Sequence, residues 1–451
     1  AWDYQPRFSP DGSQILFTSD RAGGNNLWTM NADGSDMEAL SDTGEKDTNC
    51  GAWSPDGDWI ASKRRLTDGS SIGTTELWMF HRLGGAGIQI TKKDEIPEVG
   101  APVFHPDGRF VYFESRPRRF TYDQNPYQGI YQIRKFDRLT GDVSRVTGRF
   151  GGAGRPTISP DGRTLTFISR DRLDYVLVAR DLDTGAERIV FRGLNHDLQE
   201  SFAWAGTYPG MDFMPDGESI VLWAGGKIQR VDLESGEATE IPFSVDVDLV
   251  AQPAVRPTPD VTSDEFALRI LRWMPTSSRD QSIVFSALGR VSEAEADGSD
   301  AKILIDDDDA TFEFSPRYSP SGRELAWVTW NDLEKGHVFV GNANGGSAKQ
   351  ISQRPGQWVN PQWSASGDEI VVIRGSGATL RGGDLGDEMY HELWILDADG
   401  KDDPHFVKTI GARGAASRMP APFFSADGER IFYMRSAASN NAELVSVQRD
   451  G

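Results

Sequence analysis

The chain has 451 residues, of which 38% are hydrophobic, and a formal net charge of −21 with a pI near 4.7. A chain of this length can bury a sizeable core. A surface so acidic repels phosphate backbones and anionic lipid, so we do not expect the protein to bind nucleic acid or a membrane surface. No run of about 18 apolar residues occurs, so we expect no membrane insertion. The one cysteine, Cys50, excludes an internal disulfide, and we expect it to be a small core residue.

A turn followed by short strands is the first unit met along the chain. The turn Phe8–Gly12 combines a proline that fixes φ, an Asp that bonds to the backbone, and a glycine that accepts positive φ. Strands are predicted at Gln14–Ser19, Asn26–Met30 and Glu38–Ser41, with a second turn at Asn31–Gly34. The first strand carries bulk on both faces, so we expect neighbours on both sides of it.

This unit recurs through the whole sequence. Copies of the turn lie at Ser54–Gly57, His105–Gly108, Ser159–Gly162 and Met214–Gly217, and weaker copies at Ser319–Gly322, Ser364–Gly367 and Ser425–Gly428, with a degenerate one near Ser278–Asp280. Four antiparallel strands repeated every 40 to 65 residues or so are typical of β-propeller blades, which must stack because one sheet cannot cover its own faces. The sequence therefore predicts an all-β fold, a β-propeller of nine four-stranded repeats, in two groups of blades.

Two groups are predicted because the pattern breaks once. Repeats one to five occupy residues 1–241, and repeats six to nine occupy residues 268–451. Residues 242–267 between them contain three prolines and read as a crossover or an elaborated loop; one continuous ring over residues 1–451 is the alternative. The last predicted strand, Glu443–Val447, has no fourth strand after it, which indicates that the chain belongs to a longer polypeptide.

Long connections fall on the face opposite the Pro-Asp-Gly turns, which we therefore expect to be the binding face. Two of these loops carry most of the charge, and their polar rim is the predicted ligand-binding site. Its residues are Arg116, Arg118, Arg119 and Tyr122 in one loop, and Asp384, Asp387, Glu388 and His391 in the other. The guanidinium groups would take a carboxylate and the acidic set an amine or a cation. The alternative is that both loops are solvated, or dock a further domain.

No catalytic residue and no metal site are predicted. The six histidines lie singly in different repeats, without the spacing of zinc ligands. Gly69–Gly73 has the letters of a serine-hydrolase elbow but lies in a hairpin loop, and Gly151–Gly154 lacks the Gly-Lys-Ser/Thr of a phosphate loop, so we expect a tight approach between blades there. The acidic run Asp306–Asp309 is expected to be a solvated loop rather than a calcium site.

Five longer stretches resemble the TolB-like propeller region of large bacterial amidohydrolases. They are Gln5–Gly12, Phe17–Arg21, Trp223–Ile228, Phe285–Arg290 and Val328–Asp332. In that family a secreted propeller region precedes a metal-dependent hydrolase barrel, and the resemblance covers essentially this whole chain. It implies a periplasmic or extracellular location, and a partner hydrolase domain, covalently attached or docked, in which zinc or a similar divalent metal would lie. It implies no cofactor within these 451 residues.

Three functions are open at this point. The first is a non-catalytic propeller region of a secreted or periplasmic metal-dependent amidohydrolase, serving as scaffold, substrate filter or docking surface. The second is a free-standing TolB-type propeller that binds protein partners, and the third is the propeller of a tricorn-like or prolyl-oligopeptidase-like peptidase. Fold alone cannot separate them, and neither substrate nor oligomeric state can be read from the residues.

Overall fold

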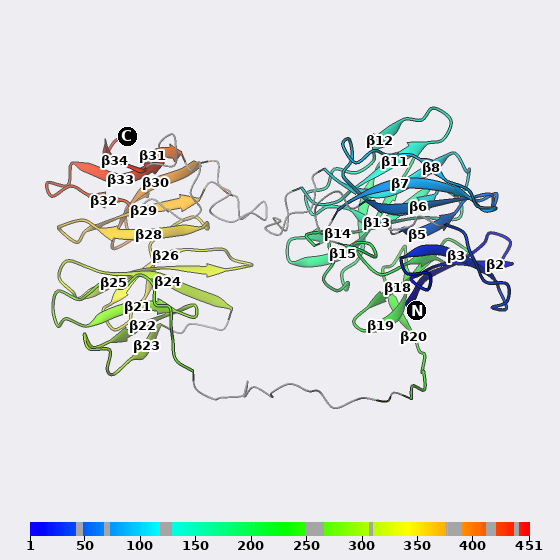
Figure 1. Cartoon of the computed structure of the whole chain (residues 1–451). Helices are drawn as coiled ribbons and strands as arrows, with labels where there is room; N and C mark the ends of the chain where they lie inside the picture. Colours follow the sequence, from blue (N-terminus) through cyan, green and yellow to red (C-terminus); the bar gives the residue numbers. More distant parts are fainter. Residues whose placement is uncertain are drawn as a thin grey trace. The chain divides into compact units, whose positions relative to one another are not determined.

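The computed structural model describes residues 1–41, 48–66, 73–117, 129–201, 203–248, 250, 266–305, 310–375, 377, 390–411, 421–436 and 442–451. These residues form strands, turns and loops, and none of them lies in a helix, so the predicted all-β class is confirmed (Figure 1). The chain divides into two compact units, Ala1–Leu249 and Val250–Gly451.

The first unit contains five four-stranded antiparallel sheets, each with its strands hydrogen-bonded in chain order. Their strands are β1 (Asp3–Phe8), β2 (Gln14–Ser19), β3 (Asn26–Asn31) and β4 (Glu38–Ala39); β5 (Thr48–Trp53), β6 (Trp59–Leu66), β7 (Thr74–His81) and β8 (Ile88–Gln89); β9 (Glu98–Phe104), β10 (Phe110–Arg116), β11 (Gln132–Asp137) and β12 (Val143–Arg145); β13 (Gly154–Ile158), β14 (Thr164–Asp171), β15 (Asp174–Asp181) and β16 (Glu187–Phe191); and β17 (Asp212–Phe213), β18 (Ser219–Ala224), β19 (Lys227–Asp232) and β20 (Ala238–Ile241).

The second unit contains four further antiparallel sheets, two of them with three strands in the described residues. Their strands are β21 (Ile283–Ala287), β22 (Arg290–Ala294) and β23 (Lys302–Ile305); β24 (Thr311–Tyr318), β25 (Glu324–Asn331), β26 (Val338–Asn342) and β27 (Lys349–Gln350); β28 (Trp358–Trp363), β29 (Glu369–Gly375), β30 (Tyr390–Asp397) and β31 (His405–Gly411); and β32 (Phe423–Phe424), β33 (Arg430–Ser436) and β34 (Ala442–Gln448). Isolated bridges, Arg272 to Ser286 and Thr276 to Ile283, stand where β21 would have a regular first neighbour.

The repeated turn has the geometry that its residues predict. The amide of Gly12 donates to the carbonyl of Ser9 at 2.9 Å, and Gly12 has φ of 72°. The hydroxyl of Ser9 donates to Asp11 at 2.6 Å and accepts from the amide of Gln14 at 2.9 Å, which fixes the start of β2. The same turn recurs from sheet to sheet, so it sets the hairpin between the first and second strands.

Neighbouring sheets bury one another's faces, as the repeat predicts. Between the second and third sheets, Leu77 of β7 packs in one buried cluster with Val99 of β9 and with Val111 and Phe113 of β10. Leu77, Val111 and Phe113 are fully buried, and each such side chain contributes about 1.5–3 kcal/mol relative to an exposed position. The core therefore lies between sheets rather than at a single centre.

Candidate functional site

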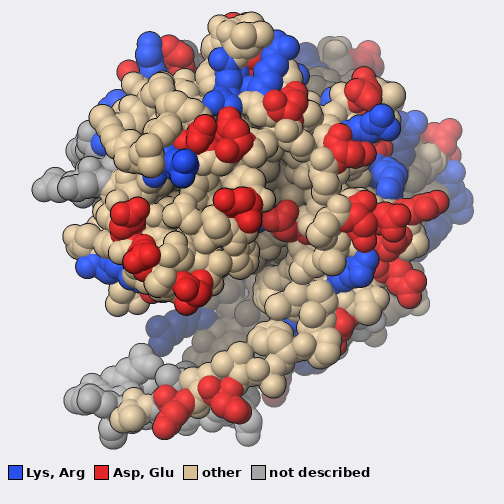
Figure 2. Space-filling model, turned by 90° about the vertical axis from the view of Figure 1, so that its right-hand side faces the viewer, with Lys and Arg blue, Asp and Glu red and all other residues tan. Residues whose placement is uncertain are grey.

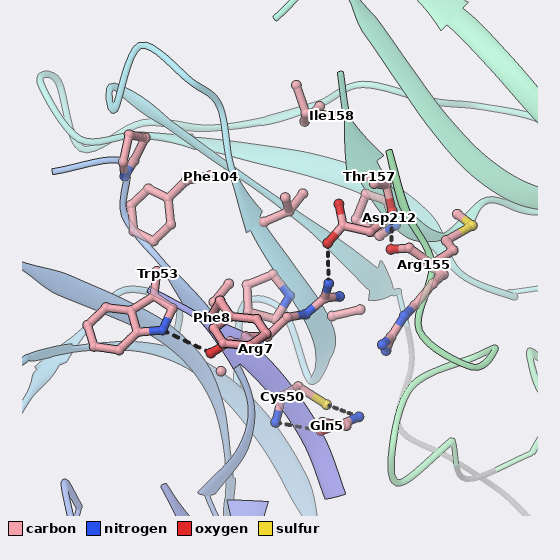
Figure 3. Close-up of a pocket in the computed structure, with 18 of the residues that line it drawn as sticks. Gln5, Arg7, Phe8, Cys50, Trp53, Phe104, Arg155, Thr157, Ile158 and Asp212 are labelled. Atoms are coloured by element: carbon pink, nitrogen blue, oxygen red, sulfur yellow. Dashed lines mark hydrogen bonds and ion pairs between the residues drawn. The ribbon is translucent and has the colours of Figure 1, made fainter. Parts of the chain in front are cut away.

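The first strands of all five sheets in the first unit meet around one cavity of about 650 Å³ (Figure 3). Prolines of four repeated turns line it, together with aromatic and aliphatic side chains. The prolines are Pro10, Pro55, Pro106 and Pro160, and the apolar side chains include Phe8, Trp53, Phe104, Ile158 and Met211. A cavity of this size is in the range of ligand pockets, and its position on five strands makes it the candidate functional site.

An ion pair joins the first of these sheets to the fifth. The guanidinium of Arg7 in β1 lies 2.6 Å from the carboxylate of Asp212 in β17, and the two residues are 205 positions apart in the sequence (Figure 3). Their side chains are 35% and 68% exposed, so the pair contributes about 1 kcal/mol or less. The pair links the first and fifth sheets beside the cavity, but it adds little to the stability of the fold.

Each of the first four inner strands contains one non-glycine residue in the left-handed region. These residues are Gln5, Cys50, Ala101 and Arg155, with φ between 41° and 57°. A proline or glycine follows each one, and the pairing with the second strand shifts register there, as in a β-bulge. Such a conformation costs about 1–2 kcal/mol per residue, and strained backbone of this kind concentrates at functional sites.

The bulges turn polar groups toward the inner end of the cavity. The Gln5 side chain donates to Sγ of Cys50 at 3.3 Å and accepts from the Cys50 amide at 3.0 Å (Figure 3). It also donates to the carbonyl of Ala205 at 2.6 Å. Cys50 is buried, as predicted, but it lines the cavity instead of lying in the core between sheets.

The closing segment, residues 197–208 except residue 202, bonds to these sheets at the end of the cavity opposite the repeated turns. Its Ala205 carbonyl accepts from Gln5 of the first sheet. Its Trp204 carbonyl accepts from Nζ of Lys63 in the second sheet at 2.6 Å, and Lys63 is only 4% exposed. The segment therefore bonds to the inner ends of both sheets.

The closing segment is also bonded to the third and fourth sheets. Glu114 of β10, 1% exposed, accepts at 2.7 Å from the hydroxyl of Thr207. Arg170 of β14 forms ion pairs with Asp197 and Glu200 of the segment. Burial alone would lower the pKa of Arg170, but its bonds to these two carboxylates outweigh burial and raise it. The Tyr208 hydroxyl of the segment also donates to the Trp223 carbonyl of β18 in the fifth sheet at 2.9 Å. The segment is therefore bonded to all five sheets, and it covers the inner end of the cavity.

The open end of the cavity is acidic. Each of the four turn prolines that line it is followed by an Asp. Hydrogen bonds from the Ser9 hydroxyl and from the amide and hydroxyl of Ser13 hold the pKa of Asp11 at about 2. Hydrogen bonds from Ser54 and Ser159 likewise lower the pKa of Asp56 and Asp161. Figure 2 shows a face of the molecule that is hollowed near its centre, with Asp and Glu side chains around the hollow.

Comparison with known proteins gives partial matches. No family model matches the chain. A protein of Sulfurisphaera tokodaii named as a tricorn-like protease C-terminal subunit is 26% identical over 196 residues, which is 43% of this chain and 19% of that protein. The uncharacterized peptidase YuxL of Bacillus subtilis is 28% identical over 166 residues, which is 36% of this chain and 21% of that protein. The matched region spans about a fifth of each of these relatives.

Among solved structures, TolB from Acinetobacter baumannii is similar to part of the chain. The likeness covers 54% of this chain and 54% of TolB, at 18% sequence identity and a TM-score of 0.43.

Only two of the eight predicted rim residues lie in the described part of the chain. Arg116 ends β10 and is buried, with its guanidinium 5.1 Å from the centre of the Tyr131 ring. His391 is the second residue of β30 and is also buried. Both were predicted in exposed loops, and that placement is wrong, because the adjoining strands extend further than the loop composition indicated. The other six residues, Arg118, Arg119, Tyr122, Asp384, Asp387 and Glu388, lie outside the described residues.

Other predicted features can be placed in part. Within the described ranges, no group of three or more His, Cys, Asp or Glu side chains is arranged to hold a metal ion. The run Asp306–Asp309 and nearly all of Gly69–Gly73 lie outside those ranges. A tight approach is present at Gly151–Gly154, but a Cβ atom on Gly152 or Gly154 would collide first with the closing segment and not, as predicted, with a neighbouring blade. The described residues also include no helix suited to crossing a membrane.

Neither the cavity nor the closing segment was predicted from the sequence. A signal for the bulged inner strands was present, since a proline inside a predicted strand marks an edge or a bulge, and Pro6, Pro102 and Pro156 occupy that place in three repeats. The closing segment gave no such signal, because most of its partners are distant in the sequence, from 27 positions for Arg170 to 200 positions for Gln5.

Proposed function

We propose that this chain is a non-catalytic β-propeller region that scaffolds a hydrolase and binds a ligand or protein partner for it. The five sheets of the first unit would be the blades of one ring, and the four sheets of the second unit a second group of blades. The blind cavity of the first unit carries the proposal. A pocket on five strands, open at one end, can hold the end of a ligand but cannot pass a chain through to the other side.

The hydrolase that we propose is a metal-dependent amidohydrolase, in the periplasm or outside the cell. This rests on the resemblance of the five stretches named above, of which Trp223–Ile228 and Phe285–Arg290 form hairpins across β18–β19 and β21–β22. The metal, zinc or a similar divalent ion, would belong to the hydrolase domain, attached or docked, and no residue of this chain is assigned a catalytic role. Because the cavity is blind, docking fits it better than filtering along the ring axis.

A second candidate is the propeller of a peptidase of the tricorn or prolyl-oligopeptidase type. The observation in its favour is that both curated relatives carry protease or peptidase names. A free-standing TolB-type binding propeller is the third candidate.

The reading frame that encodes this chain separates the three. We expect it to continue into a barrel domain with a His-x-His strand motif. A downstream serine elbow would replace our proposal with the peptidase, and a stop codon close after Gly451 would replace it with the free-standing propeller. The 451-residue chain, incubated with zinc and amide substrates, should show no turnover. Turnover that copurifies with the chain and is lost on mutation of a described residue would contradict the non-catalytic assignment.

A further inference from the structure

Arg155 presents a buried positive charge to the cavity. It lies in the bulge of β13, and only 6% of its surface is exposed. Its Nη1 donates to the carbonyl of Ala205 at 3.3 Å, and its guanidinium forms no ion pair with a carboxylate of the described chain. Burial lowers the pKa of Arg155, and the nearby carboxylates of Glu114 and Asp212 offset this effect only in part. A guanidinium has five N–H donors, so most of its hydrogen-bonding capacity is unused here.

A second buried arginine of the same sheet shows the contrast. Arg170 of β14 is 5% exposed and forms ion pairs with two carboxylates of the closing segment. The carboxylate of Glu114 is hydrogen-bonded to Arg155, but it accepts from the backbone amide of Arg155 at 2.7 Å and not from the guanidinium. The fold therefore pairs the guanidinium of Arg170 with two carboxylates and leaves that of Arg155, a residue of the cavity wall, without an ion pair among the described residues.

The position of the Arg155 guanidinium is built into the fold. A Cβ atom on Gly206 would lie 2.5 Å from its Nη1, and one on Gly210 would lie 3.2 Å from its Nη2. Gly206 also has φ of 103°, which side-chain-bearing residues rarely adopt. The two glycines thus leave room for the guanidinium, and the Ala205 carbonyl orients it. The guanidinium is therefore positioned before any ligand binds.

The other residues of the cavity indicate the kind of ligand that would carry an anionic group to Arg155. The second cavity arginine, Arg7, is neutralised by Asp212, so Arg155 is the charge that an anion would pair with. The walls are proline rings and apolar side chains, including Trp53 and Met211, which suit the apolar part of a peptide. The mouth carries the aspartates of the repeated turns, which favour a neutral or basic segment outside.

We propose that the cavity of the first unit binds the C-terminal end of a peptide, with the terminal α-carboxylate on the guanidinium of Arg155. The closing segment blocks the far end, so the peptide enters from the turns with its terminus first and stops at Arg155. This inference rests on the proposed binding role, and it names the ligand class and the direction of binding. Planar bidentate pairing with a carboxylate is the geometry for which a guanidinium is best suited.

Calorimetric titration of the 451-residue chain with tripeptide pools tests this proposal. One pool has N-acetylated tripeptides of mixed sequence with free C-terminal carboxylates, and the matched pool has the same tripeptides as C-terminal amides. We expect the free acids to bind and the amides to bind at least about tenfold more weakly, because a charge-assisted bond to a buried group is lost. Equal binding of both pools, or no binding of either, overturns the proposal.

Variants and a competing anion locate the site. Arg155→Gln should weaken binding of the free acids about tenfold or more and bring it to the level of the amides. The matched control is Arg192→Gln, at an exposed arginine paired with Asp171 and Asp174 outside the cavity, and its affinity should equal that of the wild type. If Arg155→Gln does not fold, the comparison of acid and amide on the wild type decides. Acetate or inorganic phosphate that displaces the peptide and binds as tightly would show an anion site without peptide recognition.

The outcome is separate from that of the proposed function. Peptide binding is measured on this chain alone, whereas the hydrolase assignment is decided by the reading frame. A barrel in the frame with no peptide binding refutes only this inference. Peptide binding by a chain whose frame stops near Gly451 refutes only the hydrolase scaffold.

Discussion

Substitution of Glu114 by Gln should loosen the closing segment from the third sheet. The carboxylate accepts at 2.7 Å from the Arg155 amide, at 2.7 Å from the Thr207 hydroxyl and at 3.3 Å from the Thr207 amide. In Glu114→Gln one oxygen becomes a donor that meets an amide donor, and the remaining bonds lose their charge assistance. Bonds to a charged group contribute about 1.5–3 kcal/mol and neutral ones about 0.5–1.5 kcal/mol, so the expected loss is about 2–3 kcal/mol.

Hydrogen exchange and urea unfolding together measure this effect. The amides of Thr207 and its neighbours in the closing segment should exchange faster in Glu114→Gln, and the free energy of unfolding of the first unit should fall by the amount above. The control is Glu240→Gln, at an exposed carboxylate paired with Lys227, which should change stability by less than about 0.5 kcal/mol. Unchanged exchange across the closing segment in Glu114→Gln would refute the view that this buried carboxylate holds it in place.

Two further predictions concern the glycine-rich approach and the repeated turn. A Cβ atom in Gly151→Ala would lie 2.6 Å from the carbonyl carbon of Arg170, so overpacking should lower the free energy of unfolding in urea by about 1–3 kcal/mol. In the control Gly148→Ala the new Cβ atom meets only a flexible side chain, and the free energy of unfolding should fall by less than about 0.5 kcal/mol. Equal losses in the two variants would contradict the steric explanation. In Ser9→Ala the pKa of Asp11 should rise from about 2 toward 3.8, as followed by carboxyl-carbon NMR. Because the pKa of Asp11 in the folded state lies below the usual value, this turn stabilises the fold above about pH 4 and loses that contribution as pH falls toward 2. If the pKa of Asp11 is the same in the wild type and in Ser9→Ala, the Ser9 hydroxyl is not the cause of the shift.

Local chemistry made the strands and turns predictable from the sequence. The strand Gln14–Ser19 was predicted with its observed bounds, and the Ser9 turn with its positive-φ glycine, because both depend on residues within a few positions of each other. The strand predicted at Glu38–Ser41 was only partly right. The structure ends β4 at Ala39, and Leu40 and Ser41 are buried after the strand ends.

The candidate site could not be predicted in the same way. Arg155 is an ordinary strand residue by its neighbours in the sequence, and its buried position depends on two glycines more than 50 positions away. The Arg7 and Asp212 pair depends on closure of the ring over 205 positions. Long-range closure of this kind leaves no periodic or compositional trace, whereas the charge-rich loops that the sequence analysis favoured were prominent only in composition.

The separation between Arg7 and Asp212 also sets an order of assembly during synthesis. Because the two residues are 205 positions apart and elongation runs at about 5–20 residues per second, β1 emerges from the ribosome roughly 10–40 s before its partner in β17 exists. Late in that interval four sheets stand without the fifth, and the buried Lys63 and Glu114 still lack the Trp204 carbonyl and the Thr207 hydroxyl that they bind. The nascent first unit therefore has an exposed apolar flank for tens of seconds, which is the interval in which a holding chaperone would be needed.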